Sequence, residues 1–145
     1  MSVFSITLES LSIITYKAYN PVEEKEDYSG ELRVAAIIRV SAASKKVAVV
    51  IKAEGYIRTG KGTQMIPVGY IETLTEFLTE TGTANVKAGR KPVALTAEME
   101  NYLIGIAYNS TRGLLCERGR NDLMGAIVLP LVAPEKIVRE VLQDT

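Results

Sequence analysis

The strongest constraint on the fold is the stretch 97–141, in which a long apolar helix is joined through a Leu-Pro turn to a short closing helix. Thr96 is placed to cap the long helix, and Gly119 is its natural stop. Apolar residues at helical spacing give the long helix a wide apolar face, which another layer of the protein must cover. The face comprises Met99, Leu103, Ile106, Ala107, Thr111, Leu114 and Leu115.

The covering layer is predicted by alternating apolar and polar residues, the pattern of a half-buried strand. Residues 31–42 and 45–57 both follow this pattern, and the short turn between them predicts an antiparallel hairpin. A further strand is expected over 3–19, with a bulge near Ser10 where the apolar positions change phase. Three long strands are therefore expected, and a fourth is not.

Residues 68–79 are expected to form an additional helix. Pro67 is suited to the first turn of a helix, and Ile71, Leu74 and Phe77 recur at helical spacing. The expected fold class is α+β, with an antiparallel sheet packed on one face by the long helix and the short C-terminal helix. A length of 145 residues suits one domain over 1–145.

The composition excludes whole classes of chemistry. The chain has no histidine and one cysteine, Cys116, so a Ser-His-Asp triad, a Cys-His pair, a histidine-ligated zinc and an internal disulfide cannot form. A small enzyme that uses tyrosine, lysine or carboxylates is disfavoured, because no convergent set of these residues stands out. We expect neither an enzyme nor a bound cofactor or metal.

Charge and hydropathy bear on location. Because 17 basic residues balance 17 acidic ones, no strong field attracts the chain to nucleic acid or to an anionic membrane. The first residues lack the charged segment and apolar core of a signal peptide, and no apolar run approaches the roughly 20 residues that span a bilayer. We expect a cytoplasmic protein without nucleic-acid binding or stable membrane insertion.

The C-terminal third contains two segments with a recognisable pattern. Residues 102–128 carry a Thr111-Arg112-Gly113 step and a following apolar run, and the next segment is Leu129-Pro130-Leu131-Val132-Ala133-Pro134. Together they resemble the SecB family of protein-export chaperones, in which the second segment is similar to a Leu-Ala-Pro-Val turn. Residues 31–57 also look like the central hairpin of that fold. The resemblance covers roughly half of the chain.

The resemblance implies an ATP-independent holding chaperone that binds unfolded polypeptide clients for protein export. It also implies a homo-oligomer, either a dimer or a dimer of dimers, which is a tetramer. Binding of many sequences requires a long apolar surface. Candidate lining residues of a client groove are Tyr56, Ile57, Met65, Ile66, Tyr70, Ile127, Leu129 and Leu131. For any one of them, a place in the ordinary core is the more frequent alternative.

An oligomer interface is expected on the long helix. Glycine within a helix destabilises it by about 1 kcal/mol relative to alanine, so two interior glycines suggest close contact with another element. The candidate interface residues are Gly105, Tyr108, Arg112 and Gly113.

Two departures from the family pattern affect the functional hypothesis. The family's first strand carries two acids that help to dock the translocase motor SecA, whereas the matching stretch Ile13–Lys17 has none. This difference argues against SecA binding. The helix expected at 68–79 lies where the family has a mostly irregular connection. An adaptor dedicated to one partner, such as an antitoxin, fits these departures as well as an export chaperone does.

Overall fold

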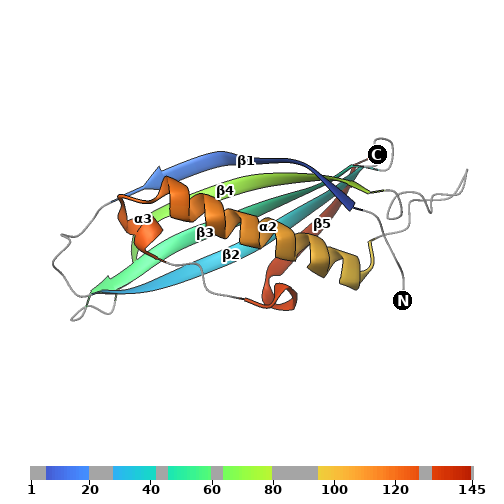
Figure 1. The fold of residues 1–145 in the computed structure, drawn as a ribbon. Helices are drawn as coiled ribbons and strands as arrows, with labels where there is room; N and C mark the ends of the chain where they lie inside the picture. The colour runs from blue at the N-terminus through green and yellow to red at the C-terminus, as the bar shows by residue number, and fades with distance from the viewer. Residues whose placement is uncertain are drawn as a thin grey trace, which may run out of the picture.

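Long strands dominate the fold, and one long helix crosses them (Figure 1). The computed structural model describes residues 6–19, 28–41, 46–59, 64–79, 95–127 and 132–144. The elements, in chain order, are the strands β1 (Ile6–Ala18), β2 (Tyr28–Ser41), β3 (Lys46–Thr59) and β4 (Ile66–Thr79), the helices α2 (Ala97–Arg118) and α3 (Leu123–Ala126), the 3-10 helix η1 (Pro134–Lys136) and the strand β5 (Val138–Asp144). The predicted α+β class, with a sheet covered on one face by a long and a short helix, is confirmed.

The strands form one five-stranded sheet in the order β1-β4-β3-β2-β5. β2 and β3 pair antiparallel without interruption from Tyr28 and Thr59 to Ser41 and Lys46, which confirms the predicted hairpin. β1 and β4 extend the sheet antiparallel on the far side of β3. The pairing of β1 shifts register between Leu8 and Ser10, where the sequence predicts a bulge, and again after Ile13.

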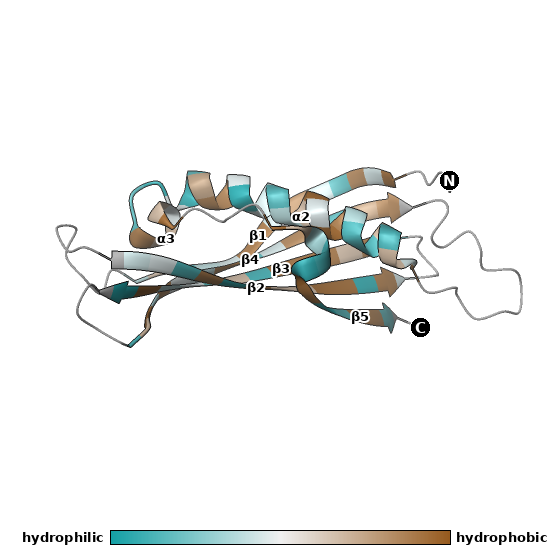
Figure 2. Cartoon of the chain, turned by 90° about the horizontal axis from the view of Figure 1, so that it is seen from below, coloured by the Kyte–Doolittle hydropathy of each residue, from teal (hydrophilic) through white to brown (hydrophobic). Residues whose placement is uncertain are grey.

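The core lies between the sheet and α2. The even-numbered residues of β2 from Ala36 to Val40, and the odd-numbered residues of β3 from Val47 to Ala53, are buried on the helix side. The apolar residues of the strands concentrate toward the end at which β1 begins and β5 ends (Figure 2). Thus the alternation that predicted the strands also determines which face of the sheet α2 covers.

The predicted helix at 68–79 is wrong, because this segment is the strand β4, which pairs with both β1 and β3. Ile71 and Phe77 alternate with half-buried residues, but Thr73 and Thr75 stand between them and are also fully buried. Two polar residues on the buried face hide the alternation, while Leu74 on the opposite face completes a false helical spacing. The sheet therefore has a fourth long strand.

The predicted closing helix is also wrong. Pro134 begins only a 3-10 turn, and the chain then continues as β5, which pairs parallel with residues 35–41 of β2. The apolar residues from Ile137 to Leu142 have a spacing that suits a helix, but the outer edge of β2 provides a backbone ladder that favours a strand. The short helix of the fold is instead α3, directly after α2.

Helix α2 begins and ends where the sequence predicts. The Thr96 hydroxyl accepts a hydrogen bond from the Met99 N–H at 3.2 Å, and the Gly119 N–H donates to the Leu115 carbonyl at 2.8 Å. The chain then turns sharply into α3, and a Cβ atom on Gly125 would lie 1.8 Å from the Gly119 carbonyl oxygen. Only glycine allows this approach. No described helix is long and apolar enough to cross a membrane.

Candidate functional site

The sheet surface opposite α2, here called the open face, is the side of the sheet that no described helix covers. Among the described residues, the helices all lie on the other side of the sheet (Figures 1 and 2). The alternation that buries one face presents polar, aromatic and scattered apolar side chains on the other. In the three central strands these are Arg33, Ala35, Ile37, Arg39, Lys52, Glu54, Tyr56, Tyr70, Glu72, Leu74 and Glu76.

Aromatic, sulfur and charged side chains meet at one end of the open face. This tyrosine patch comprises Arg33, Glu54, Tyr56, Met65 and Tyr70. The Arg33 guanidinium lies 4.8 Å from the centre of the Tyr56 ring and donates a hydrogen bond to the sulfur of Met65 at 3.8 Å. The Tyr56 hydroxyl donates to Glu54 Oε2 at 2.6 Å, and Glu54 lies opposite Tyr70 in the ladder of β3 and β4.

Charged side chains contact both tyrosines of the patch. Because the Tyr56 hydroxyl donates to the Glu54 carboxylate, the pKa of Tyr56 is raised above its ordinary value. The raised pKa favours the neutral form of Tyr56, which is the form that donates this hydrogen bond. The Nζ atom of Lys17 lies 5.7 Å from the centre of the Tyr70 ring, so a cation lies over each of the two rings.

A shallow pocket of ≈ 180 Å³ lies beside the tyrosine patch. Its lining residues are Lys52, Ala53, Glu54, Tyr70 and Glu72. Tyrosine, methionine and arginine are enriched in protein–protein interfaces, because each offers apolar area together with a polar or polarisable group. The chemistry of the patch therefore suits contact with another polypeptide.

The predicted client groove divides between the two faces of the sheet. Tyr56, Met65 and Tyr70 come together in the tyrosine patch, whereas Ile57 and Ile127 are buried on the helix side, at 0% and 6% exposure. Ile66 pairs with Ile57 and packs against the same core. Leu129 and Leu131 lie outside the described residues. Sequence reasoning could not separate the faces because β4 was expected to be a helix.

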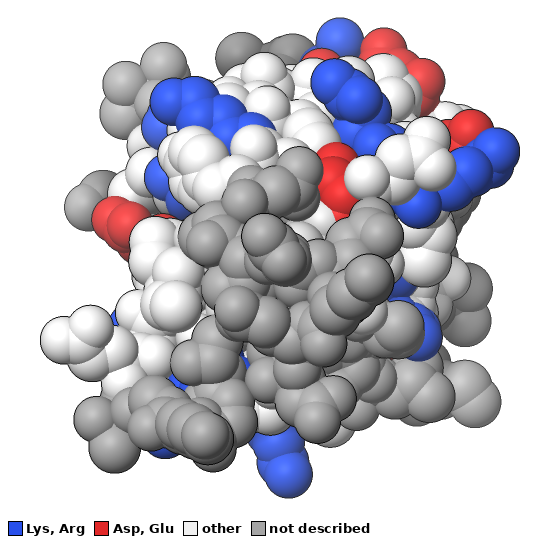
Figure 3. Space-filling model, turned by 90° about the vertical axis from the view of Figure 1, so that its left-hand side faces the viewer, with Lys and Arg blue, Asp and Glu red and all other residues white. Residues whose placement is uncertain are grey.

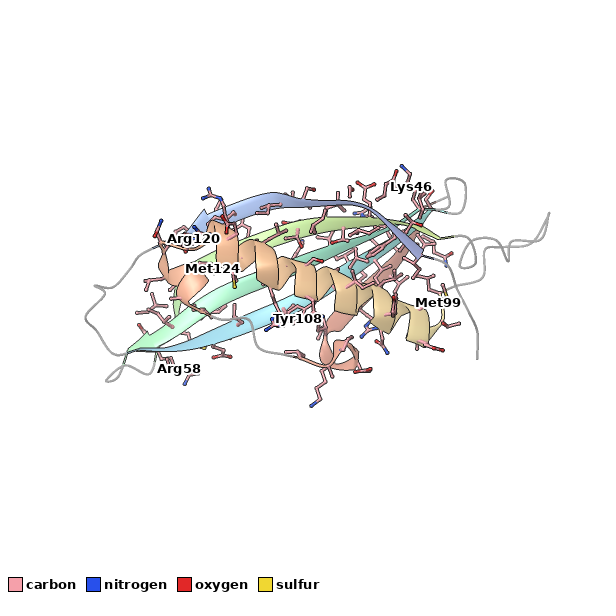
Figure 4. All side chains as sticks on the ribbon, viewed as in Figure 1. Lys46, Arg58, Met99, Tyr108, Arg120 and Met124 are labelled. Carbon is pink, nitrogen blue, oxygen red and sulfur yellow. The ribbon has the colours of Figure 1, made fainter. Side chains whose placement is uncertain are left out.

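The four predicted interface residues of α2 lie in different environments. Tyr108 lies between α2 and the sheet (Figure 4) and is 2% exposed, and burial raises its pKa. The close approach expected at Gly105 is made by Pro134 of the same chain, which lies 3.3 Å from the position of a Cβ atom. A Cβ atom on Gly113 would have no described atom within 4 Å. Arg112 donates to Asn109 on the same helix.

Sequence reasoning missed an exposed apolar strip on β1. Leu8, Leu11 and Ile14 are 50%, 38% and 49% exposed. Leu8 and Leu11 pair with Phe77 and Thr75, which are buried, so these two leucines lie on the helix side of the sheet but beyond the cover of α2. Their alternation is visible in the sequence. Their exposure follows from the edge position of β1, which depends on β4 being a strand.

Charges of both signs are mixed among the described residues at the end of the molecule where α2 stops. At the end where α2 stops, marked by Arg58 and Arg120 in Figure 4, basic side chains occur in several places with acidic ones between them (Figure 3). Arg58 pairs with Glu31 at 4.0 Å and Arg120 with Glu117 at 2.5 Å. This surface therefore has no uniform charge for a strongly acidic or basic partner.

No family model and no curated protein matches the sequence. The SecB-like chaperone Rv1957 of Mycobacterium tuberculosis, solved in complex with a ChAD peptide from the HigA1 antitoxin, matches with a TM-score of 0.63 over 88% of this chain and 89% of that chain. The chain has a SecB-like fold. At 13% sequence identity, the likeness establishes the fold alone.

A second solved structure, a protein of unknown function from Streptococcus agalactiae, aligns over 91% of this chain and 98% of that chain at 14% identity. Its TM-score of 0.35 is too low to establish a shared fold. The SecB-like architecture therefore rests on the mycobacterial chaperone, and it agrees with the resemblance seen in the C-terminal third of the sequence.

Proposed function

We propose that this protein is a SecB-like holding chaperone that binds extended, non-native polypeptides on its open face without ATP. The observation that carries the proposal is the tyrosine patch, where two tyrosines, a methionine and an arginine lie together on a surface that no described helix covers. The SecB-like fold adds support, since a neighbour with this fold was solved with a bound peptide.

The proposed mechanism acts on the rate at which a client aggregates. Tyr56 and Tyr70 offer rigid apolar rings, and Met65 offers a flexible side chain that adapts to different partners. Burial of apolar area is non-directional, so such contacts tolerate many client sequences. The apolar strip of β1 gives an extended client a second place to bury apolar side chains. Binding holds the client apart from other unfolded chains and so delays aggregation.

A second candidate function is that of an adaptor for one partner, such as an antitoxin. The mycobacterial neighbour favours it, because that SecB-like chaperone was solved with a peptide from an antitoxin. The two functions differ in the range of polypeptides that the protein binds. A holding chaperone binds several unrelated unfolded chains with similar affinity, whereas a dedicated adaptor binds one peptide at least about 100-fold more tightly than the others.

The proposed setting is the cytoplasm, and a role in export through SecA is not part of the proposal. The stretch Ile13–Lys17 lies in β1, where Thr15 and Lys17 pair with Glu72 and Tyr70 of the open face. This strand therefore presents a basic residue there, in place of the acids that the family uses for SecA. We further propose a homo-oligomer, a dimer or a dimer of dimers, with the outer side of α2 around Gly113 as a contact.

The test measures binding of the purified protein to a slowly folding, labelled polypeptide, before and after that polypeptide has folded. Fluorescence anisotropy should report binding to the unfolded form only, and the protein at stoichiometric amounts should delay aggregation of several unrelated chains. Binding to a single peptide alone would favour the adaptor. Absence of binding to every unfolded chain would refute the chaperone proposal.

A further inference from the structure

The strand β5 is weakly held on the edge of the sheet. None of its described side chains is buried: Val138 is 73% exposed, while Val141 and Leu142 are half-buried. The strand contributes seven residues in a parallel ladder, which is slightly less stable per residue than an antiparallel one. Because β5 stands last in the strand order, only one of its edges is paired.

The attachment of β5 is concentrated at its start. Ile137, directly before the strand, is 4% exposed. Arg139 donates to Asn101 at 2.5 Å and to the Pro134 carbonyl, and it lies 3.6 Å from Glu100 of α2. Among the described residues, the contacts that hold the strand from residue 140 onward are its ladder with β2 and the packing of Val141 against the core. The end of β5 can therefore fray while Ile137 and Arg139 stay in place.

The edge beneath β5 does not depend on β5 for its shape. β2 is paired with β3 along its whole length, so its residues 37–41 keep their extended form when the end of β5 leaves. This edge then offers unpaired backbone groups, the half-buried Ile37 on the open face, and Ile38 and Val40 on the core side. A strand that adds there gains backbone hydrogen bonds that do not depend on its sequence.

We propose that the end of β5, from Glu140 onward, is exchangeable, and that an extended segment of a non-native polypeptide takes its place on residues 37–41 of β2. This inference rests on the proposed function, because it names how a client adds to the sheet. The occupant has the chemistry of β5 itself: an extended backbone with half-buried aliphatic side chains. β5 covers the edge while no client is bound and so protects it from unwanted strand pairing.

The test locks β5 to β2 with a disulfide. Arg39 and Leu142 are partners in the ladder, and paired residues of neighbouring strands lie within the Cα distance that a disulfide allows. The variant Arg39→Cys/Leu142→Cys is made in a Cys116→Ser background, because Cys116 is exposed. The matched control is Ser29→Cys/Arg58→Cys, which joins β2 to β3 outside the tyrosine patch and outside the edge that β5 covers, between two strands that both stay in place.

Oxidation of the locked variant should weaken binding of the unfolded polypeptide by about tenfold or more, and reduction should restore it, because the competent state is removed. Oxidation of the control should change nothing. In the wild type, client binding should speed hydrogen exchange in β5. Equal binding by the oxidised and reduced locked variant, with a wild type that binds, would overturn strand exchange alone. If the wild type binds no unfolded chain, both proposals fall.

Discussion

Tyr16 ties the edge strand β1 to the turn between α2 and α3. Its hydroxyl lies 2.8 and 2.7 Å from the two carboxylate oxygens of Asp122 and donates to that group. Asp122 also accepts the N–H of Gly125 at 3.0 Å, and the Arg118 guanidinium lies 4.9 Å from the Tyr16 ring centre. One side chain therefore holds an outer strand of the sheet against the helical layer, and this contact was not predicted from the sequence.

The contact predicts a pH dependence of stability. Burial, and then the hydrogen bond to Asp122, raise the pKa of Tyr16 well above its usual range. A raised pKa in the folded state gives stability that is fully present below the ordinary tyrosine pKa of about 10 and is lost as pH rises through the folded pKa.

Tyr16→Phe should lose about 1 kcal/mol of stability at pH 7, where the hydrogen bond is intact. Above pH 10 its stability should fall less steeply than that of the wild type, by up to about 1.4 kcal/mol per pH unit. Urea denaturation between pH 7 and about pH 11.5 measures both effects. If the stability of the wild type and that of Tyr16→Phe fell equally steeply above pH 10, the raised pKa could not be assigned to Tyr16.

At the scale of elements, the contact between α2 and β4 includes a buried polar pair. The Thr111 hydroxyl donates to the Ala107 carbonyl at 2.7 Å and lies 2.7 Å from the Thr73 hydroxyl. Since the Thr111 proton is engaged, Thr73 donates to Thr111. Both hydroxyls are fully buried, and Thr73 has its printed acceptor on α2, whereas Thr111 also has a partner within its own helix.

Thr111→Val should therefore destabilise the fold by about 1–3 kcal/mol, because it leaves the Thr73 hydroxyl buried without an acceptor. The double variant Thr73→Val/Thr111→Val should recover part of this loss, since both polar groups are gone. A double-mutant cycle from urea denaturation measures the coupling. Additive effects of the two substitutions would show that the hydroxyls do not depend on each other.

Gly113 gives a test of the proposed oligomer contact on α2. A Cβ atom there meets no described atom of the chain, so Gly113→Ala should stabilise the helix by about 1 kcal/mol. If a second subunit approaches closely at this position, the same substitution should weaken association. Sedimentation velocity over a range of concentrations measures it, with Gly105→Ala, which faces Pro134, as the matched control. Unchanged association in Gly113→Ala would exclude this contact.

The sequence correctly predicts the elements in which the spacing of apolar residues matches the burial seen in the fold. The strands β2 and β3 and the ends of α2 belong to this group, because their alternation and caps are local. β4 is missed because two polar residues, Thr73 and Thr75, occupy its buried face, where Thr73 meets Thr111 of α2, a residue distant in sequence. β5 is missed because the edge of β2, distant in sequence, determines its conformation.

At the scale of the whole molecule, one layer of helix on a sheet leaves two unlike surfaces. α2 covers the core on the helix side, whereas the open face carries the tyrosine patch, and the edge strands carry the apolar strip of β1 and the exposed Val138 of β5. Sequence reasoning selected three members of the patch, Tyr56, Met65 and Tyr70. It could not assign Arg33 and Glu54 to the patch, because cross-strand register brings them there.

The central claim is that the open face binds non-native polypeptide through the tyrosine patch. The most direct measurement compares Tyr56→Ala/Tyr70→Ala with Tyr102→Ala, an exposed tyrosine on α2, for binding of a labelled unfolded polypeptide by anisotropy. The double variant should bind about tenfold or more weakly, while Tyr102→Ala binds as the wild type does and circular dichroism shows all three folded. A double variant that stays folded and keeps wild-type affinity would contradict the claim.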